Sequence, residues 1–471
     1  MHGETDQVAA AGVSPEDGAA PAGRIAADQP WPSARSSCYT MFVLGVVVMF
    51  TILDRQVLAL MIAPIKADFG ISDTQAALLL GAAFSLTYAL AGLPIARIAD
   101  VANRRNLIAA CIAFWSASTM ACGLAQNYAH LFLSRLGIGI GEAGYAPATW
   151  SMVTDTFPRE KVAFATGTIA IGGYVGSGGA LILGGSVLAL LAAFPIGALP
   201  VIGVLRPWQW TFVIVGLPGL LWALVVLTLR EPPRRGVAAG QRRSVPAADV
   251  ARLLWADWRT YTAVIGGMAV KSLMTMGTTQ WMPTLFVRQF GWTLTQIGLW
   301  QGIVVLIAGP IGLVAGGKLS EYLHRRGMID ADLRIVFWAL IVTVPLSVIF
   351  PLVADPHAML ALYGLNIFIA SLGIGPGTAS LQVITPNPMR AQVSAIYMFC
   401  MNVIGLALGP LIVALFTDYL FSNEQDLKYS ISLCAITLGP ITCLVVAQGL
   451  RPYRQSYANA MRRDGRPASK E

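Results

Sequence analysis

The stretch LGIGIGEA at Leu136–Ala143 recurs later in the chain as LGIGPGTA at Leu372–Ala379, and this repeat decides the fold. A second pair behaves in the same way, because ADVANRR at Ala99–Arg105 is echoed by SEYLHRR at Ser320–Arg326. Each pair lies within or just after long apolar runs, at corresponding places in the two halves of the chain. The sequence therefore predicts two copies of one helical unit, an arrangement that membrane proteins use to build a site between two bundles.

The composition excludes a soluble protein. Of the 471 residues, 56% are hydrophobic and 12% are charged, whereas globular domains have about 45–50% apolar and about 25% charged residues. The mean hydropathy is +0.65, which agrees with a chain whose solvent is mostly lipid. So few charges cannot cover a soluble surface, and this excludes a soluble enzyme, a coiled coil and a disordered chain.

The basic residues and the cysteines do not indicate a nucleic-acid or metal partner. The net charge of +8 comes mostly from Lys and Arg in short segments between apolar runs. The six cysteines fall in or beside apolar runs and form no CxxC pair, which is typical of small packing residues. We therefore expect no nucleic-acid partner, no disulfide framework, no metal and no other cofactor.

Twelve apolar runs are near or above the length of about 20 residues that a membrane-spanning helix needs. The sequence predicts an all-α membrane protein of twelve transmembrane helices, arranged as two six-helix repeats. The predicted helices are Tyr39–Ile65, Ser72–Ile98, Leu107–Ala125, His130–Val153, Val162–Phe194, Trp210–Leu229, Tyr261–Phe286, Gln296–Val314, Leu333–Val353, Met359–Ile384, Ala391–Phe416 and Tyr429–Gly449.

A disordered tail is predicted before the first helix and a polar linker between the halves. The tail contains acidic residues before any apolar run, which does not suit a signal peptide. Within the linker, Ser244–Trp258 has the pattern of a short amphipathic helix along the membrane surface. The predicted parts are a tail at 1–37, an N-terminal six-helix bundle at 38–229, the linker at 230–260, a C-terminal six-helix bundle at 261–450 and a second tail at 451–471.

Positive charge predicts the orientation in the membrane. If both termini lie on one face, that face collects most of the basic loop residues, whereas the other face holds only Lys66, Arg206, Arg288 and Lys428. By the positive-inside rule, both termini and the linker are then cytoplasmic. Short loops and a composition rich in Ala and Arg favour a bacterium, so we expect a multi-pass protein of the bacterial inner membrane.

Few ionisable residues lie inside the predicted helices, and each costs roughly 2.5–3.5 kcal/mol to place at the bilayer centre. They are Asp54 and Arg55 in the first helix, Arg135 and Glu142 in the fourth, and Lys271 in the seventh. Arg135 and Glu142 are about two helical turns apart and so share one face of their helix. Residues of such cost are candidates for function.

The repeated stretches resemble signatures of the major facilitator superfamily. Its loop signature, roughly G-x-x-x-D-R-x-G-R-R, is matched by ARIADVANRR at Ala96–Arg105, which keeps the acidic residue and the final arginines but lacks both glycines. Its fourth-helix signature, R-x-x-x-G-x-G, is matched by RLGIGIG at Arg135–Gly141. A Gly-Pro motif is degraded at Gly172–Gly179 and clear at Gly405–Pro410. The resemblance covers about residues 38–450.

Within that superfamily, the chain resembles the Spinster family of lysolipid and sphingolipid transporters. The residues that carry this resemblance are DRQ at Asp54–Gln56, RLGIGIGEA at Arg135–Ala143 and DTFP at Asp155–Pro158. The resemblance implies a secondary transporter that works by alternating access. It also implies that the first and fourth helices line the cavity of the N-terminal half.

We predict proton coupling at Asp54, Glu142 and Arg135. A carboxylate in a cavity that wets and dries during transport changes its proton affinity, whereas Arg135 stays charged and stabilises whichever carboxylate is ionised. Arg135 is also suited to bind a phosphate through two parallel hydrogen bonds. The alternative is a static ion pair that only fixes the helices.

The C-terminal half keeps the glycine frame and loses the charges, since Ser371 and Thr378 stand where Arg135 and Glu142 stand in the other half. We predict that neutral polar groups of this half contact the substrate and that Lys271 contacts an anionic headgroup. For Lys271, the alternative is snorkelling toward the interface. The predicted substrate-binding residues are Arg135, Lys271, Tyr363, Asn366, Ser371 and Thr378.

A cytoplasmic gate is predicted at the two repeated loops. In the family that the chain resembles, the loop after the second helix pairs with neighbouring helix ends when the transporter faces outward. The alternative is that these charges only set the topology. The predicted gate residues are Asp100, Arg104, Arg105, Glu321, Arg325 and Arg326.

The predicted function is proton-coupled transport of a single-chain amphiphilic lipid, such as a lysophospholipid or a sphingosine-1-phosphate-like molecule, by a monomer in the lipid bilayer. The runner-up is a proton-coupled carrier of small organic acids or drugs, and a third alternative is a lipid sensor that does not transport. Motifs of membrane-embedded enzymes, such as G-x-S-x-G and H-E-x-x-H, are absent from the sequence, so we expect no enzymatic activity.

Overall fold

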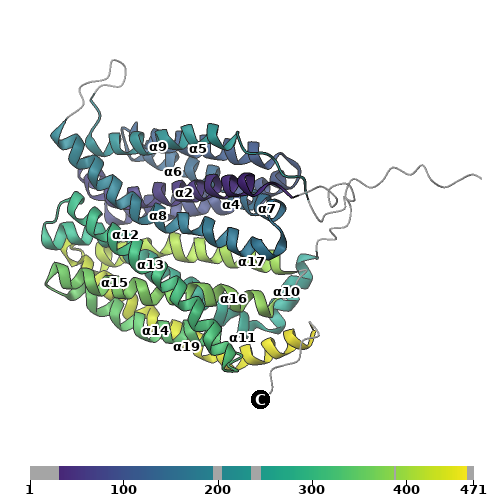
Figure 1. Cartoon of the computed structure of the whole chain (residues 1–471). Helices are drawn as coiled ribbons and strands as arrows, with labels where there is room; N and C mark the ends of the chain where they lie inside the picture. Colours follow the sequence, from purple (N-terminus) through teal and green to yellow (C-terminus); the bar gives the residue numbers. More distant parts are fainter. Residues whose placement is uncertain (1–30, 195–203, 235–244, 387–388, 464–471) are drawn as a thin grey trace, which may run out of the picture.

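The computed structural model describes residues 31–194, 204–234, 245–386 and 389–463. Within these ranges the chain is helical and contains no strand. The helices form two groups that lie side by side, one from α2 to α9 and the other from α12 to α19 (Figure 1). The predicted all-α fold with two helical bundles is confirmed.

In the part of the chain that the structure describes, the N-terminal group contains six helical columns. Three elements, α3, η1 and α4, follow one another without a gap and form one column, whereas α6 and α7 are two parts of a column that is broken at Ala143 and Gly144. The elements are α2 (Ala34–Phe69), α3 (Asp73–Ala77), η1 (Leu78–Ala82), α4 (Ala83–Val101), α5 (Arg104–Gly123), α6 (Tyr128–Glu142), α7 (Tyr145–Thr156), α8 (Arg159–Ala193) and α9 (Pro207–Val226).

The C-terminal group repeats this arrangement, with its own fourth column broken at Gly373. It is preceded by α10 (Ala247–Ala256), which confirms a helix within the linker. The remaining elements are α11 (Trp258–Tyr261), η2 (Thr262–Gly266), α12 (Gly267–Phe290), α13 (Leu294–Arg325), α14 (Ala331–Ile349), η3 (Phe350–Leu352), α15 (Pro356–Leu372), α16 (Ile374–Ile384), α17 (Arg390–Cys400), η5 (Met401–Ala407), α18 (Leu408–Leu415), η6 (Phe416–Phe421), η7 (Glu424–Asp426) and α19 (Leu427–Arg463).

Ten of the twelve columns that the described residues form are long and apolar enough to cross a membrane. The other two are the column of α6 and α7 and the column of α11, η2 and α12. These two columns carry Arg135, Glu142 and Lys271. These two less apolar columns thus hold three of the five candidate charges, whereas Asp54 and Arg55 lie in the apolar helix α2. The total agrees with the predicted twelve.

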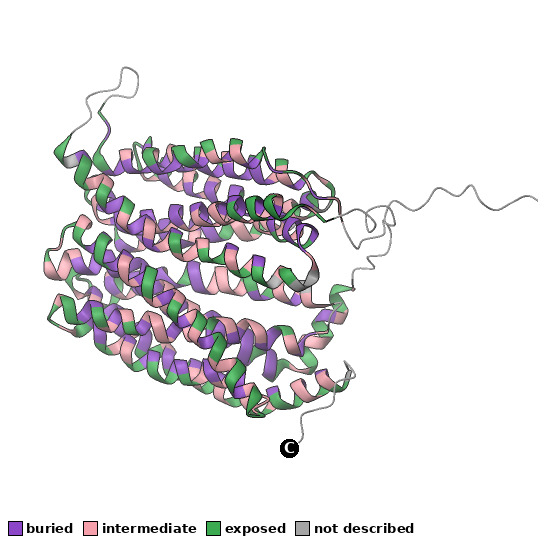
Figure 2. Ribbon diagram, in the orientation of Figure 1, coloured by how far each residue is buried: buried purple, intermediate pink, exposed green. Residues whose placement is uncertain are grey.

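The outer surface of both groups is apolar. Large side chains such as Phe42, Leu90 and Leu224 in the N-terminal group, and Ile311 and Leu444 in the C-terminal group, are exposed. Figure 2 shows buried residues on the helix faces that meet and exposed residues along the outer faces. Apolar side chains on the outside suit a surface that is covered by lipid rather than by water.

The same turn follows the first column of each half. Gly70 has φ 62° and Gly291 has φ 65°, a left-handed conformation that glycine adopts without a steric cost. In both halves a Ser or Thr and a Gln then form a capping box that starts the next helix. The stretches at 69–75 and 290–296 are therefore a third repeat, with one local geometry in both halves.

Glycines let the two halves approach closely where α8 packs along α13. A Cβ added to Gly178 would lie 2.6 Å from the carbonyl oxygen of Gly302, and one added to Gly302 would lie 2.7 Å from that of Gly178. Small residues at such a crossing bring the two backbones into contact. The halves also meet where α2 packs on α12 and where α4 packs on η5.

The glycines of LGIGIGEA hold α6 against two neighbouring columns. A Cβ on Gly139 would lie 2.5 Å from the carbonyl oxygen of Phe84 in α4, and one on Gly141 would lie 2.9 Å from the backbone nitrogen of Trp115 in α5. Larger residues would push the helices apart. These two glycines therefore act in packing, and they fix the place of Arg135 and Glu142.

Candidate functional site

An ion pair between a partly buried arginine and a fully buried glutamate joins the first and fourth columns of the N-terminal half. Arg55 of α2 donates to one carboxylate oxygen of Glu142 through Nη2 and through Nε, the latter at 3.1 Å. Glu142 is fully buried and is the last residue of α6, at the break of its column. The Arg55 guanidinium also lies 4.1 Å from the ring centroid of Phe84, a cation–π contact that strengthens in a desolvated place.

Asp54 lies beside this pair and is itself buried. Its carboxylate is within electrostatic range of Glu142, Arg135 and Arg55, and Thr119 of α5 lies near it. The sequence predicted that Asp54 approaches Arg135 or Glu142, and the structure gathers all three in one cluster. The direct partner of Glu142, however, is Arg55, which the sequence identified only as a charge within the membrane.

Arg135 is fully buried and retains unused hydrogen-bond donors. Its Nε donates to the carbonyl oxygen of Leu79 at 3.3 Å, and Leu79 belongs to the π-helical turn η1, a distortion that is frequent at functional sites. In the described part of the chain, Nη1 and Nη2 of Arg135 and Oε1 of Glu142 have no hydrogen-bond partner. Since unpartnered buried polar atoms are costly, the cluster has capacity for a proton or an anionic group.

Lys271 takes a related place in the C-terminal half. It is buried in α12, and its Nζ donates to the carbonyl oxygen of Ala370 at 2.6 Å. Ala370 lies in the last turn of α15, just before the break at Gly373. A cation at a helix C-terminus is favourable. In each half, therefore, a cation from the first column reaches the break in the fourth column.

Two other predicted substrate contacts lie inside the C-terminal bundle. Tyr363 is buried in a small polar group with Thr279 and Gln301, at oxygen–oxygen and nitrogen–oxygen distances of 3.4 Å. Asn366 donates to Ser347 of α14 at 2.9 Å. Tyr363 thus faces the seventh and eighth columns, whereas Asn366 ties the tenth column to the ninth.

Ser371 and Thr378 lie on either side of the break in the tenth column. Ser371 lies near Tyr174 of α8, which belongs to the opposite half of the molecule. Thr378 is half-buried, donates to the carbonyl oxygen of Ile374 at 2.9 Å and lies within reach of Tyr397 of α17. Of the neutral candidates, Ser371 is the one that the structure brings to the opposite half.

The loop after the second column is held by a buried arginine. Arg104 is fully buried and donates to Asp155, to Glu231 at 2.7 Å and to the carbonyl oxygen of Pro232 at 2.7 Å. Arg105 donates its backbone N–H to Glu231 at 2.9 Å. These partners belong to the N-terminal half or to the segment directly after it. The side chain of Asp100, the remaining predicted gate residue of this loop, lies outside the described residues.

The corresponding loop of the C-terminal half has a different structure. Glu321 and Arg325 form an exposed ion pair one helical turn apart, and the Arg326 guanidinium lies 4.5 Å from the ring centroid of Tyr322. These contacts lie within one helix and do not reach the other half. The two loops match in sequence but not in burial or in partners.

On the far face, opposite the face that carries the start of α2 and the end of α19, four charged residues join the halves. Lys66 and Asp73 come from the N-terminal half, whereas Arg288 and Glu424 come from the C-terminal half. Arg288 binds Asp73 through two hydrogen bonds of 2.7 Å, and Lys66 lies 3.0 Å from Glu424. Because Asp73 is fully buried, this far-face cluster joins the two halves through a charged contact that is partly shielded from solvent.

The sequence did not predict the far-face cluster, although it contained one signal. Charged residues near helix ends are common, so Lys66 and Arg288 indicated only topology. Their signal is that they are two of the four basic residues on a face otherwise poor in positive charge. Asp73 and Glu424 are far apart along the chain, and only the tertiary fold brings them to these cations.

Comparisons with known proteins agree with this architecture. The chain is 28% identical over 389 residues to an MFS-type efflux pump of Mycolicibacterium smegmatis, with 80% of this chain and 84% of that protein covered. It is 26% identical over 309 residues to a D-galactonate transporter of Escherichia coli, with 61% of this chain and 68% of that protein covered.

A solved structure shares the fold. It is the crystal structure of a bacterial homologue of the human lysosomal transporter Spinster in an inward-facing, unoccupied conformation. The two structures superpose with a TM-score of 0.74 and 24% sequence identity, over 93% of this chain and all of the other. Residues 44–410 match the family described as the Major Facilitator Superfamily, and the chain belongs to this family of membrane transporters.

Proposed function

We propose that this member of the Major Facilitator Superfamily is a proton-coupled secondary transporter that moves a single-chain amphiphilic lipid by alternating access. The observation that carries the proposal is the cluster of buried Asp54, Arg135 and Glu142 with partly buried Arg55. Two carboxylates and two guanidinium groups inside a membrane bundle are costly, and a proton is the ligand that such a cluster can exchange with the least rearrangement.

Proton binding acts on the broken column of the N-terminal half. When Glu142 takes a proton, its ion pair with Arg55 weakens, and α2 and α6 lose the charged contact that joins them at the break. Asp54 and Arg135 lie close enough to redistribute the charge. The protonation state of the cluster therefore biases the relative position of the two columns, as a switch between two states requires.

The arrangement of ion pairs supports a state that is closed at the far face. The far-face cluster crosses between the halves, whereas the ion pairs of Arg104 and of Arg325 on the terminus face each stay within one half. We propose that the terminus face is cytoplasmic and that the structure is inward-facing. In the outward-facing state, Asp100, Arg104, Arg105, Glu321, Arg325 and Arg326 would form the cytoplasmic gate.

The proposed substrate is a lysophospholipid or a sphingosine-1-phosphate-like molecule. Arg135 offers two unpartnered donors for a phosphate headgroup, and Lys271 offers a second cation in the opposite half. Tyr363, Asn366, Ser371 and Thr378 supply neutral polar groups on that side. We propose that the protein works as a monomer in the bacterial inner membrane and takes its substrate from the lipid bilayer.

The second candidate function is a proton-coupled carrier of small organic acids. The specific observation in its favour is the similarity to a D-galactonate transporter of Escherichia coli. A carboxylate would bind the donors of Arg135 as well as a phosphate would. The two functions therefore differ in whether an apolar chain contributes to binding.

Transport by the purified protein in proteoliposomes with a pH gradient tests the proposal. We expect a radiolabelled lysophospholipid to move, and we expect Arg135→Ala to reduce its binding far more than removal of one chain carbon, which is worth about 0.8 kcal/mol. Asp54→Asn and Glu142→Gln should each lose stimulation by the gradient, while at least one keeps ligand binding because the amide resembles the protonated acid.

Two results would contradict the proposal. If galactonate binds and moves while the lysophospholipid does neither, the organic-acid carrier replaces the lipid transporter. If both amide variants keep the pH dependence of the wild type, the buried cluster is a static ion pair and proton coupling is wrong.

A further inference from the structure

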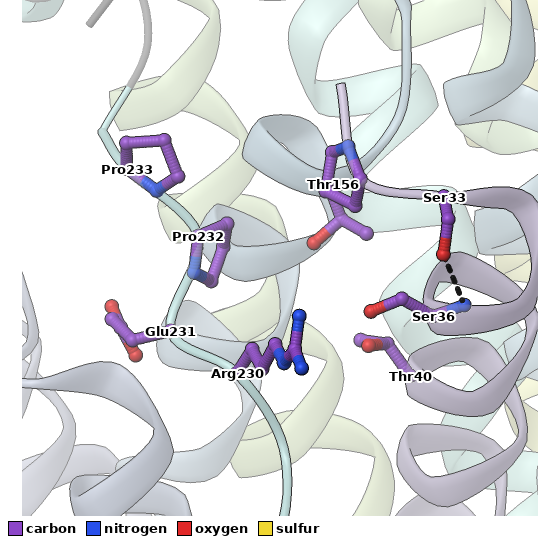
Figure 3. Close-up of a pocket in the computed structure, with 9 residues that line it drawn as sticks. Ser33, Ser36, Thr40, Thr156, Arg230, Glu231, Pro232 and Pro233 are labelled. Carbon is purple, nitrogen blue, oxygen red and sulfur yellow. Dashed lines mark hydrogen bonds between the residues drawn. The ribbon is translucent and has the colours of Figure 1, made fainter. Parts of the chain in front are cut away.

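A polar pocket lies on the terminus face of the N-terminal half, away from the cluster of Asp54, Arg55, Arg135 and Glu142. It is formed where the start of α2, the end of α7 and the segment after α9 meet, and it has a volume of about 290 Å³. Figure 3 shows hydroxyl groups of Ser36, Thr40 and Thr156 on one side and Arg230 on the other. Thr40 is separated from Asp54 by 14 residues of one helix, about 21 Å along its axis.

Arg230 provides a positive charge that no described residue neutralises. Its guanidinium points toward Ser36 and Thr40 (Figure 3), and within the described ranges it forms no ion pair or hydrogen bond. Glu231 also lines the pocket, but its carboxylate accepts hydrogen bonds from Nε of Arg104 and from the backbone of Arg105. The charge of the pocket is therefore positive.

Thr40 adds a hydroxyl that has no partner, on a side chain that is otherwise buried. Its side chain is 4% exposed, it lines the pocket, and it has no hydrogen-bond partner among the residues that the structure describes. A satisfied threonine in a helix usually donates to the carbonyl one turn earlier, as Thr156 does to Met152 at 2.7 Å. Thr40 is thus free to donate to a group in the pocket.

The N-terminus of α2 completes the polar lining. Ser33 caps this helix by accepting from the backbone N–H of Ser36 at 3.3 Å, and the first turn contains no acidic residue. The unpaired N–H groups and the helix dipole favour an anion at such an end. Arginine, hydroxyl and helix N-terminus together are the donors that bind phosphate in proteins.

We propose that this pocket binds a phosphate group, which is either free inorganic phosphate or the headgroup of an anionic phospholipid. Arg230 neutralises its charge, Thr40 and Ser36 donate to its oxygens, and the start of α2 contributes its dipole. The site holds α2, α7 and the segment after α9 together and is separate from the transported substrate. It does not depend on the proposed transport function, since its test measures binding alone.

Thermal unfolding of the full-length protein in detergent tests the first source. Inorganic phosphate, titrated against chloride at constant ionic strength, should raise the unfolding midpoint. Arg230→Gln should weaken the apparent affinity about tenfold or more, because it removes a charged donor. Thr40→Val, which keeps the side-chain shape, should weaken it by less. The midpoints without phosphate show whether each variant is folded.

Native mass spectrometry tests the second source. If a phospholipid supplies the phosphate, the protein should retain phosphatidic acid in preference to phosphatidylcholine, and Arg230→Gln should lose this preference. If free phosphate is the ligand, the midpoint rises without a retained phosphatidic acid. Either result supports the site and identifies its source.

Arg35→Gln is the matched control, because Arg35 is an exposed arginine in the first turn of α2 that does not line the pocket. Its affinity for phosphate should stay close to that of the wild type. The proposal is overturned if neither ligand binds in an Arg230-dependent way, or if Arg35→Gln weakens binding as much as Arg230→Gln does. Full affinity in Thr40→Val would also contradict it, since the anion would then lie outside the pocket.

Discussion

The two broken columns of this protein contain the same repeated glycine stretch, but they differ in charge and in where the break falls. In the repeat, Leu372 corresponds to Leu136, whereas Glu142 corresponds to Thr378. The fourth column breaks after Glu142 and the tenth breaks after Leu372, in both cases within the repeated glycine stretch. In the N-terminal half, the cation at the break is Arg55 and its partner is a carboxylate. In the C-terminal half, the cation is Lys271 and its partner is a backbone carbonyl oxygen.

This difference shows that a break in the helix does not by itself determine which chemical group the nearby cation contacts. A carbonyl oxygen keeps its charge distribution at every pH, whereas a carboxylate gains and loses a proton. The glycine stretch accompanies a break in each half, but only the N-terminal break joins its cation to a carboxylate. The loops show the same contrast, because Arg104 is buried among several partners while its sequence counterpart Arg325 is exposed beside one.

The largest expected effect sharpens the contrast between the loops. Arg104→Gln removes the guanidinium that binds Asp155, Glu231 and the carbonyl oxygen of Pro232, and it should cost about 3–5 kcal/mol, as the loss of one partner of a buried pair does. Arg325→Gln should leave stability nearly unchanged, because exposed pairs contribute little. Thermal unfolding of the two purified variants measures both, and equal losses would show that the loops are equivalent after all.

The second effect concerns coupling at the two breaks. Glu142→Gln should remove the proton-dependent part of transport, and coupling free energies of this kind correspond to about 5–150-fold in affinity. Thr378→Val, at the matching position of the C-terminal half, should keep the stimulation. The ratio of initial rates with and without a pH gradient in proteoliposomes is the measurement. Loss of stimulation by the pH gradient in Thr378→Val would contradict the prediction that coupling depends on the N-terminal half alone.

The third effect is a shift between conformations at the far face. Arg288→Gln removes the clamp on Asp73 from the opposite half and should increase the population that is open there, since a few kcal/mol redistribute two such states. Distances between spin labels at Gln126 and Ala354, one in each half, report the opening on a background without native cysteines.

Arg206→Gln is the control for this experiment. Arg206 lies on the same face and pairs with Asp68 at 2.7 Å, but both residues belong to the N-terminal half. Its distance distribution should match that of the wild type. An identical distribution in Arg288→Gln and in the wild type would show that the far-face cluster does not hold the halves together.

The smallest effect is a pH dependence in the C-terminal loop. Burial raises the pKa of Asp330, but hydrogen bonds and charge from Arg454 and Arg334 outweigh it, so the pKa lies below its ordinary value. A carboxyl with a lowered pKa stabilises the fold above its ordinary pKa, and this contribution is lost as the pH falls through the folded-state value. In the wild type, the free energy of unfolding should fall as the pH drops below the ordinary pKa of an aspartate. In Asp330→Asn, this fall should be smaller by about 1 kcal/mol or less.

The result would also refine the comparison of the loops. Asp330 with Arg334 and Arg454 is the buried carboxylate and arginine group of the C-terminal half, on residues other than those that the repeat predicts. If Asp330→Asn and the wild type lose the same free energy of unfolding at acidic pH, this group does not stabilise its loop as Arg104 stabilises the loop of the other half.

Much of the architecture follows from the sequence because lipid imposes a simple rule. Each crossing must be helical, long and apolar, so the twelve predicted runs correspond to the twelve columns. The glycine repeat gave the equivalence of the two halves. The sequence also identified Asp54, Arg135 and Glu142 as members of one cluster, because intramembrane charges are few and two of these share a helix face.

The partners of these charges could not be predicted from the sequence. Arg55 and not Asp54 pairs with Glu142, since adjacent residues of a helix point in directions about 100° apart and packing decides which one faces the break. The tie between Asn366 and α14 depends on the tilt of whole columns. The far-face cluster and the pocket between Thr40 and Arg230 both combine residues that are distant in sequence.

By itself, the sequence determined that this protein lies in a lipid bilayer and that it is built from apolar helices. It also determined the repeat of its two halves and the short set of costly intramembrane charges. These features are fixed by composition and spacing, which are local along the chain. Only the tertiary structure decided which charges meet, which loop arginine is buried and on which face charged side chains join the two halves. Electrostatic and hydrogen-bond partners lie within a few ångströms in space, and no local pattern specifies contacts between residues that are hundreds of positions apart.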